Sequence, residues 1–425
     1  MNTQHEKETK RAYIAWLLIT IFFGYQYILR SSPNVMYEVL RASFMFRAEE
    51  FATLGAIYLL AYALMQIPLG VLVDKIGVKK VVVSAILLCV LGAVLFATAQ
   101  SFAALQLARL AIGIGSAPAF MCALKTIADH FPPGKRALLS GTTLMFGTAG
   151  ALFSGKAILL FLREFDWREV TIVVALMGVV LCATVALLMR EGARDKATLN
   201  HESAAGVGGT VLGVLRHRHI MLYAFLAVGL YTPLAAITDL WGAAFLTKRF
   251  LMSHEDAAGA SLLMYLGLAM GSIVLPWWCE KYNRLDLGVI ICTFAISILF
   301  AVLFYSNIEN LSMVKLLLFS IGVLCGAEMM CFTGALLYSQ RYNSGEIIGV
   351  VNTLNILGGA ILQQVIGMLL DWQWTGAYDD KGVRYYSQEQ FVNAMSIIAV
   401  LLVICCFASL FLLGGPHTRY RVKKV

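Results

Sequence analysis

Four ionisable side chains, Arg30, Arg109, Asp239 and Glu328, stand inside long apolar stretches of the chain. A charge within a membrane-spanning segment is costly, so such residues usually pair, face a cavity or serve a function. A guanidinium group matches the two oxygens of a carboxylate, and a buried carboxylate can carry a proton. Two cations and two anions around one cavity would suit a zwitterionic solute. Alternatively, they pair with one another as a structural or gating network.

Arg30 has an unusually polar neighbourhood for an apolar stretch. Tyr25, Gln26 and Tyr27 precede it, and Pro33 follows, where it can loosen a helix. We therefore expect Arg30 to bind an anionic group of a substrate, with these three neighbours lining the same site. The alternative is that Arg30 extends its charged end to the membrane surface. That alternative applies equally to Arg109, which lies about two helical turns from the end of its stretch.

The composition excludes an ordinary water-soluble enzyme. Of the 425 residues, 60% are hydrophobic and only 14% are charged, against about 25% charged in soluble domains. The net charge of +8 does not indicate nucleic-acid binding, because the basic residues sit in short clusters between apolar runs. The nine cysteines lie mostly inside these runs and lack the spacing of a metal site, so we expect no metal and no cofactor.

The apolar runs predict the elements that must position the four charges. A membrane-spanning helix needs about 20 apolar residues, and open strands cannot face lipid. Twelve runs meet this length: 12–36, 50–73, 79–99, 102–128, 137–161, 168–189, 219–247, 256–278, 286–306, 312–338, 346–370 and 391–414. The sequence therefore predicts an all-α membrane protein with twelve transmembrane helices.

The basic residues and the longest connection predict the topology and the domains. Most of the 33 lysines and arginines fall in the termini and in the connections that share their side, which predicts that both termini are cytoplasmic. We expect an N-terminal six-helix bundle at 1–189, a cytoplasmic linker at 190–218 and a C-terminal six-helix bundle at 219–425. The glycine and acidic residue at 70 and 74 recur as Pro276 and Glu280 after the eighth run, which suggests repeated halves and alternating access.

The connection between the second and third runs carries a recognisable motif. Its glycines, acidic residue and basic residues are Gly70, Asp74, Lys75, Gly77, Lys79 and Lys80. This pattern resembles the signature of the major facilitator superfamily at the same place. The resemblance implies a major facilitator fold of two pseudo-symmetric bundles. It also implies that Asp74 latches the cytoplasmic side, together with Asp129 and the repeated Glu280.

The fourth run extends the resemblance. Arg109 precedes Gly113 and Gly115 in an arrangement similar to the helix 4 motif of the superfamily, where the arginine is linked to proton coupling. In that family, helices 1, 4, 7 and 10 form the cavity, and each of them contributes one of the four charges here. The resemblance thus implies that Arg109 takes part in proton coupling. Asp239 and Glu328, as carboxylates within apolar runs, could carry the proton or pair with an ammonium group of the substrate.

A narrower resemblance covers three short strings. The segment from Tyr25 to Pro33, the string from Asp239 to Gly242 that includes Trp241, and a loop around Arg384 resemble the phagosomal nutrient transporters of intracellular bacterial pathogens. This resemblance implies import of amino acids, or in some members nucleosides, across an inner membrane. We expect a proton-coupled amino-acid importer of the bacterial inner membrane that is a monomer, with Trp241 in the substrate site. The partners would be a small-molecule substrate, protons and the lipid bilayer, with no nucleic acid and no enzymatic activity. Nucleoside import remains one alternative and efflux of a drug or siderophore another, although Ala151 replaces the proline of the efflux motif after Gly150.

Overall fold

The computed structural model describes residues 2–189, 207–282, 284–337, 344–379 and 382–414. This part of the chain is almost entirely helical and contains one isolated bridge, between Tyr378 and Arg384. Twelve of its helices are long and apolar enough to cross a membrane. The predicted fold class, an all-α protein with twelve membrane spans, is therefore confirmed.

The chain divides into two compact units. Unit 1 contains residues 1–46, 53–196 and 381–383, and unit 2 contains residues 47–52, 197–380 and 384–425. The sequence passes between them inside the predicted linker, of which residues 190–206 lie outside the described part. The rest of that linker contains helix α9 (Val207–Arg216). The predicted domain boundaries at 189 and 219 stay a prediction.

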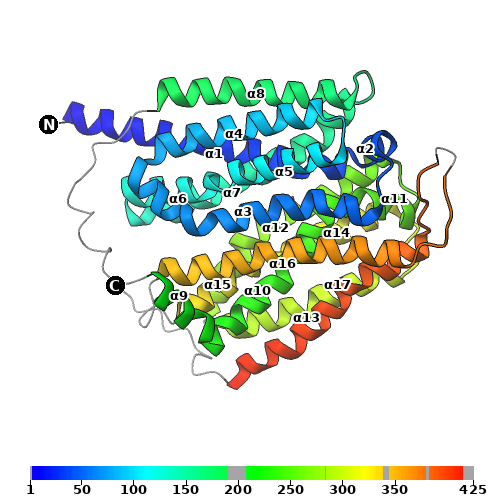
Figure 1. Ribbon diagram of the computed structural model, residues 1–425. Helices are drawn as coiled ribbons and strands as arrows, with labels where there is room; N and C mark the ends of the chain where they lie inside the picture. The colour runs from blue at the N-terminus through cyan, green and yellow to red at the C-terminus, as the bar shows by residue number, and fades with distance from the viewer. Residues whose placement is uncertain (1, 190–206, 283, 338–343, 380–381, 415–425) are drawn as a thin grey trace. The chain divides into compact units, whose positions relative to one another are not determined.

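The helices that begin in the first half of the chain are labelled in Figure 1. They are α1 (Asn2–Val35), α2 (Tyr37–Phe44), α3 (Ala48–Ile76), α4 (Val78–Thr98), α5 (Phe102–Ser116), α6 (Pro118–His130), α7 (Pro133–Phe161) and α8 (Trp167–Leu188). Helices α5 and α6 together form one membrane span, which is interrupted at Ala117 and Pro118.

The second half repeats this series. Its helices are α10 (Arg218–Ala236), a π-helical turn η2 (Ile237–Trp241), α11 (Gly242–Phe250), α12 (His254–Tyr282), α13 (Leu285–Tyr305), α14 (Leu311–Cys325), α15 (Glu328–Leu336), α16 (Ser344–Trp372), α17 (Gln388–Ser409) and a short 3-10 helix η3 (Leu410–Gly414). One span comprises α10, η2 and α11, and another comprises α14 and α15.

The lengths of matching helices show the internal repeat. Helices α3 and α12 each have 29 residues, α4 and α13 each have 21, and α8 and α17 each have 22. The short helices before α3 and α12 also end alike, at Met45 and Leu251, with φ angles of 50° and 53°. Both halves therefore use the same left-handed turn to enter their second span.

Close crossings between helices rely on glycine. A Cβ atom at Gly271 of α12 would lie within 1.9 Å of the Val323 carbonyl oxygen of α14, and one at Gly150 of α7 within 2.2 Å of the Gly24 carbonyl oxygen of α1. Lipid gives helices little hydrophobic drive to associate, so they gain contact by bringing their backbones together at small residues. One of these crossings positions α1, which carries Arg30. The other positions α14, which ends shortly before Glu328.

We expect Gly271→Ala to destabilise the protein, because the added methyl group has no space against the Val323 backbone. Such overpacking costs about 1–3 kcal/mol. The measurement is the apparent Tm of the purified protein in detergent. Gly259→Ala in the same helix is the matched control, because nothing lies within 4 Å of a Cβ atom there. Equal melting temperatures for both variants would contradict the proposed role of the crossing.

Candidate functional site

Arg109 of α5 is enclosed by backbone carbonyl groups within unit 1. Its side chain is 1% exposed, and its guanidinium donates to the carbonyl oxygens of Leu54 at 3.0 Å, Leu29 at 2.8 Å and Arg30 at 3.5 Å. Its Cζ atom lies 4.5 Å from the centre of the Tyr58 ring. This burial contradicts the alternative that Arg109 extends to the membrane surface. The residue instead ties α5 to both α1 and α3.

The proline in α1 explains why one of these carbonyls needs an arginine. In a regular helix the Leu29 carbonyl would accept from the N–H of residue 33, but Pro33 has none. Arg109 supplies a donor in its place, and the Ser32 hydroxyl adds a second at 2.9 Å. An unpaired carbonyl in an apolar interior is costly. The proline in α1 and the arginine in α5 therefore belong together.

Arg30 lies on α1 directly beside this arrangement. It is 6% exposed, and its Cζ atom lies 5.5 Å from the centre of the Tyr27 ring. The next residue, Ser31, bonds to Ser154 of α7 at 2.8 Å, which holds this part of α1 against α7. Burial at this level does not fit a side chain that has extended into the membrane surface. It leaves Arg30 as a buried cation on a helix that is held on two sides.

The three aromatic and amide neighbours of Arg30 do not lie together. Gln26 accepts a hydrogen bond of 2.8 Å from the Tyr58 hydroxyl, on the side of α3. Tyr27 is packed against Phe23 and Gly147. Tyr25 points elsewhere, because its hydroxyl contacts the position of Gly178 in α8. The structure therefore groups Gln26 with Tyr58 and the arginines, and it turns Tyr25 toward α8.

Asp239 of unit 2 lies in the π-helical turn that interrupts the seventh span. It is 3% exposed and accepts a hydrogen bond from the Tyr265 hydroxyl of α12. Single π-helical turns within α-helices occur frequently at functional sites. In the turn before it, the Ala235 carbonyl oxygen accepts a hydrogen bond of 2.9 Å from Gln363 of α16. The carboxylate thus sits in an irregular segment whose backbone is supported by α16.

Glu328 occupies a second interruption in unit 2. It is the first residue of α15, after the break at Gly326 and Ala327, and it is 6% exposed. The Asn355 amide of α16 donates to it at 2.5 Å. A carboxylate in the first turn of a helix is favoured by the partial positive charge of that end. Both acidic residues of the site are therefore placed where a span is irregular.

Trp241 closes the π-helical turn and is fully buried among protein groups. Its indole N–H donates to the Gln363 carbonyl oxygen at 3.2 Å, and its ring contacts those of Phe51 and Phe391. These contacts occupy the indole N–H and part of its ring. The structure brings Asp239 and Trp241 into one segment.

The predicted cytoplasmic latch is described only in part. The side chains of Gly70, Asp74 and Glu280 lie outside the described part of the structure. Gly77 is the one residue between α3 and α4, and its φ of 88° is a conformation that favours glycine. Lys75 and Lys80 are exposed, and Lys79 is partly exposed. Asp129 is also exposed and pairs with Lys125 of its own helix at 3.7 Å, so the latch stays a prediction.

Several residues of these clusters were not expected from the sequence. They are Tyr58, Tyr265, Asn355 and Gln363, each fully or almost fully buried. The signal was present for the two amides, because a polar side chain within a predicted span is itself unusual. The two tyrosines gave no such signal, since aromatic residues are common in apolar runs. Among the described residues, no group of three or more His, Cys, Asp or Glu side chains could hold a metal ion.

Twelve membrane-length helices in repeated halves, with buried charges at their interruptions, define a polytopic membrane protein of the transporter type. The family model of the Major Facilitator Superfamily matches residues 16–363. The chain therefore belongs to this superfamily and is a multi-pass membrane transporter. That confirms the broader of the two resemblances seen in the sequence.

Curated relatives are bacterial transporters. The uncharacterized transporter YybO of Bacillus subtilis is 31% identical over 181 residues, 41% of each chain. A protein of Escherichia coli named as a probable L-galactonate transporter is 25% identical over 48% of this chain and 46% of its own length. The hexuronate transporter of Bacillus subtilis is 21% identical over 81% of this chain and 85% of its own. The chain thus aligns with less than half the length of the first two.

Solved structures share the fold. A bacterial homologue of the human lysosomal transporter Spinster superposes with a TM-score of 0.75 at 18% identity, covering 96% of this chain and 98% of that one. A variant of the nucleoside transporter NupG gives a TM-score of 0.72 at 14% identity, covering 94% and 99%. At these identities the likeness concerns the fold alone.

We expect Arg109→Lys to destabilise the protein, because one ammonium group cannot replace a fork that reaches three carbonyl oxygens. Leaving a buried acceptor unsatisfied costs about 1–3 kcal/mol. Pro33→Ala restores an N–H for the Leu29 carbonyl, so it should recover part of this loss when the two substitutions are combined. The measurement is a double-mutant cycle of apparent Tm values. Strictly additive effects would show that Arg109 does not compensate for the proline.

Proposed function

We propose that the protein imports a small carboxylate-bearing solute, an amino acid, in symport with protons. The observation that carries this proposal is the placement of four of the buried charges: Arg30 and Arg109 in unit 1, and Asp239 and Glu328 at helix interruptions in unit 2. Arg30 is assigned to the substrate carboxylate. Asp239 and Glu328 are assigned to the substrate ammonium group and to the proton.

The two arginines have different surroundings, and this supports the choice of Arg30. Arg109 is bonded to three backbone carbonyls, so its guanidinium is engaged in holding helices together. The Arg30 Cζ atom lies 5.5 Å from the centre of the Tyr27 ring. A guanidinium group binds a carboxylate through two parallel hydrogen bonds, which gives both strength and orientation. We accordingly assign Arg109 to positioning α1 near the substrate, with its part in proton coupling acting through that position.

The two acidic residues have neutral partners. The Tyr265 hydroxyl donates to Asp239 and the Asn355 amide donates to Glu328, so neither partner adds a charge of its own. Binding and release of one proton at Asp239 or Glu328 would couple the proton gradient to uptake. The protein would lie in the bacterial inner membrane as a monomer with both termini in the cytoplasm.

A second candidate substrate class is a sugar acid. The curated relatives include proteins named for hexuronate, galacturonate and, as a probable assignment, L-galactonate. These solutes also carry one carboxylate, so Arg30 would keep its assignment, but they have hydroxyl groups in place of an ammonium group. The acidic residues would then accept hydrogen bonds from hydroxyl groups. The structural likeness to a nucleoside transporter supports the fold only.

Uptake into proteoliposomes tests the substrate class. We expect a labelled amino acid from a mixed panel to accumulate when the outside is made acidic, and to be lost when a protonophore is added. Accumulation of galacturonate without any amino acid would support the second candidate and overturn the first. Accumulation of neither class would overturn both.

Arg30→Lys tests the carboxylate assignment. It keeps the charge but loses the two-pronged geometry, so we expect uptake to fall by about tenfold or more, which corresponds to about 1.4 kcal/mol. Arg168→Lys is the matched control, because Arg168 lies at the partly exposed start of α8. Wild-type uptake by a well-folded Arg30→Lys variant would show that this arginine does not hold the substrate.

Asp239→Asn and Glu328→Gln test proton coupling. Each variant mimics a permanently protonated carboxyl group. We expect at least one of them to retain exchange of labelled for unlabelled substrate while losing accumulation driven by the proton gradient. If both variants still accumulate substrate against a gradient, the proton is carried elsewhere.

A further inference from the structure

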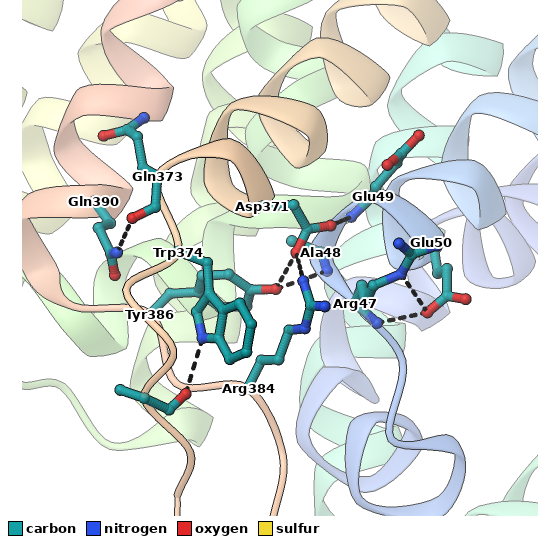
Figure 2. A network of polar contacts seen from close by, with 11 residues as sticks. Arg47, Ala48, Glu49, Glu50, Asp371, Gln373, Trp374, Arg384, Tyr386 and Gln390 are labelled. Atoms are coloured by element: carbon teal, nitrogen blue, oxygen red, sulfur yellow. Dashed lines mark hydrogen bonds and ion pairs between the residues drawn. The ribbon is translucent and has the colours of Figure 1, made fainter.

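The first turn of α3 is held by residues that follow it in the chain by more than 300 positions. The Glu49 N–H donates to Asp371 at 2.8 Å, and the Ala48 N–H donates to the Tyr386 hydroxyl at 3.1 Å, as Figure 2 shows. Asp371 lies at the end of α16, and Tyr386 lies in the loop that precedes α17. All of these residues belong to unit 2, whereas α3 from Thr53 onward belongs to unit 1.

This arrangement satisfies a helix end that would otherwise have free donors. The first four N–H groups of a helix have no partner within it. The N–H of Arg47, the residue before α3, is bonded to Glu50 at 2.7 Å, and the first two N–H groups of α3 are bonded by Tyr386 and Asp371. The negative charge of Asp371 is also favoured at a helix N-terminus. We call Asp371, Arg384 and Tyr386 together the α3 cap.

The three cap residues are also bonded to one another, in addition to the bonds that two of them make to α3. Asp371 accepts from the Tyr386 hydroxyl at 2.5 Å and from Arg384 at 3.1 Å, and its side chain is only 11% exposed. The Arg384 guanidinium lies 4.0 Å from the Trp374 ring, and its backbone bridges to Tyr378. Burial, followed by the hydrogen bond to Asp371, raises the pKa of Tyr386, so its hydroxyl keeps the proton that it donates.

Packing adds to the hydrogen bonds on the same turn. A Cβ atom at Gly367 of α16 would lie 2.6 Å from the Ala52 side chain and 2.8 Å from the Ala48 carbonyl oxygen, so α16 and this turn touch through their backbones. The ring of Phe51 meets Trp241 edge-on, with 5.4 Å between the ring centres, and both side chains are fully buried. The turn that the cap holds is therefore packed directly against the segment that contains Asp239.

Further along the same helix, two residues of α3 contact Arg109. Leu54 accepts from Arg109, and Tyr58 lies against Arg109 and donates to Gln26. These contacts belong to unit 1. One helix thus has its first turn fastened beside Asp239 in unit 2 and its next turns fastened to Arg109 in unit 1.

We propose that Asp371 is a positioning residue for transport, which fastens the first turn of α3 to unit 2. The cap determines how much free energy is needed to detach this turn from α16 and from Trp241. By the parity of the spans, the cap lies on the side of the membrane opposite to the start of α1 and the end of α17. The proposal does not depend on which solute is transported.

Amide hydrogen exchange of the full-length protein in lipid nanodiscs tests the cap without a substrate. For Asp371→Asn we expect about tenfold faster exchange in the first turn of α3, which corresponds to about 1.4 kcal/mol. Asp371→Glu should restore part of the protection, because it returns the charge. Glu389→Gln is the matched control, since it removes an exposed carboxylate at the neighbouring start of α17. Its exchange should equal that of the wild type.

Tyr386→Phe separates a local effect from a general loss of stability. It removes one hydroxyl and should accelerate exchange at Ala48 more than at the rest of the turn. Unchanged exchange in Asp371→Asn would overturn the proposal. Exchange that rises throughout the molecule in Asp371→Asn, without any local increase in Tyr386→Phe, would also overturn it. Full loss of protection in Asp371→Glu would show that the charge is not what matters.

Discussion

Every backbone donor and acceptor inside a membrane must find a partner within the protein, and the polar residues of this chain are arranged around that requirement. Pro33 leaves the Leu29 carbonyl without its regular donor, and Arg109 supplies one from a different helix. Before the π-helical turn, the Gln363 amide donates to the Ala235 carbonyl oxygen. At the start of α3, the Asp371 carboxylate accepts from the Glu49 N–H. In each case an irregular piece of helix is stable because a side chain distant in sequence completes its hydrogen bonding.

The interruptions are also where the candidate chemistry lies. Arg30 precedes the proline of α1, Asp239 occupies a π-helical turn, and Glu328 begins a helix after a break. A regular helix directs its polar backbone groups along its own axis and leaves little for a solute. An irregular turn presents a charged side chain beside backbone groups that other residues already support. Side chains from other helices support the backbone beside Pro33 and before the π-helical turn.

The two halves share their helical framework but differ in what they place in it. Matching helices have equal lengths, and both second spans follow the same left-handed turn. The first half places two arginines in its first and fourth spans, while the second half places two carboxylates in its own first and fourth spans. The two halves therefore carry buried charges of opposite sign within the same helical framework.

The sequence alone determined the membrane class, the number of spans and four charges that the fold buries, because apolar length and the rarity of charge in lipid are properties of local composition. It also indicated the superfamily through the motif after the second span. Only the tertiary structure decided what each charge contacts. Both arginines lie within apolar runs, and their contacts differ because α5 places Arg109 opposite three carbonyls of α1 and α3. Likewise, Asp371 is an ordinary acidic residue at a helix end until the fold brings the first turn of α3 beside it.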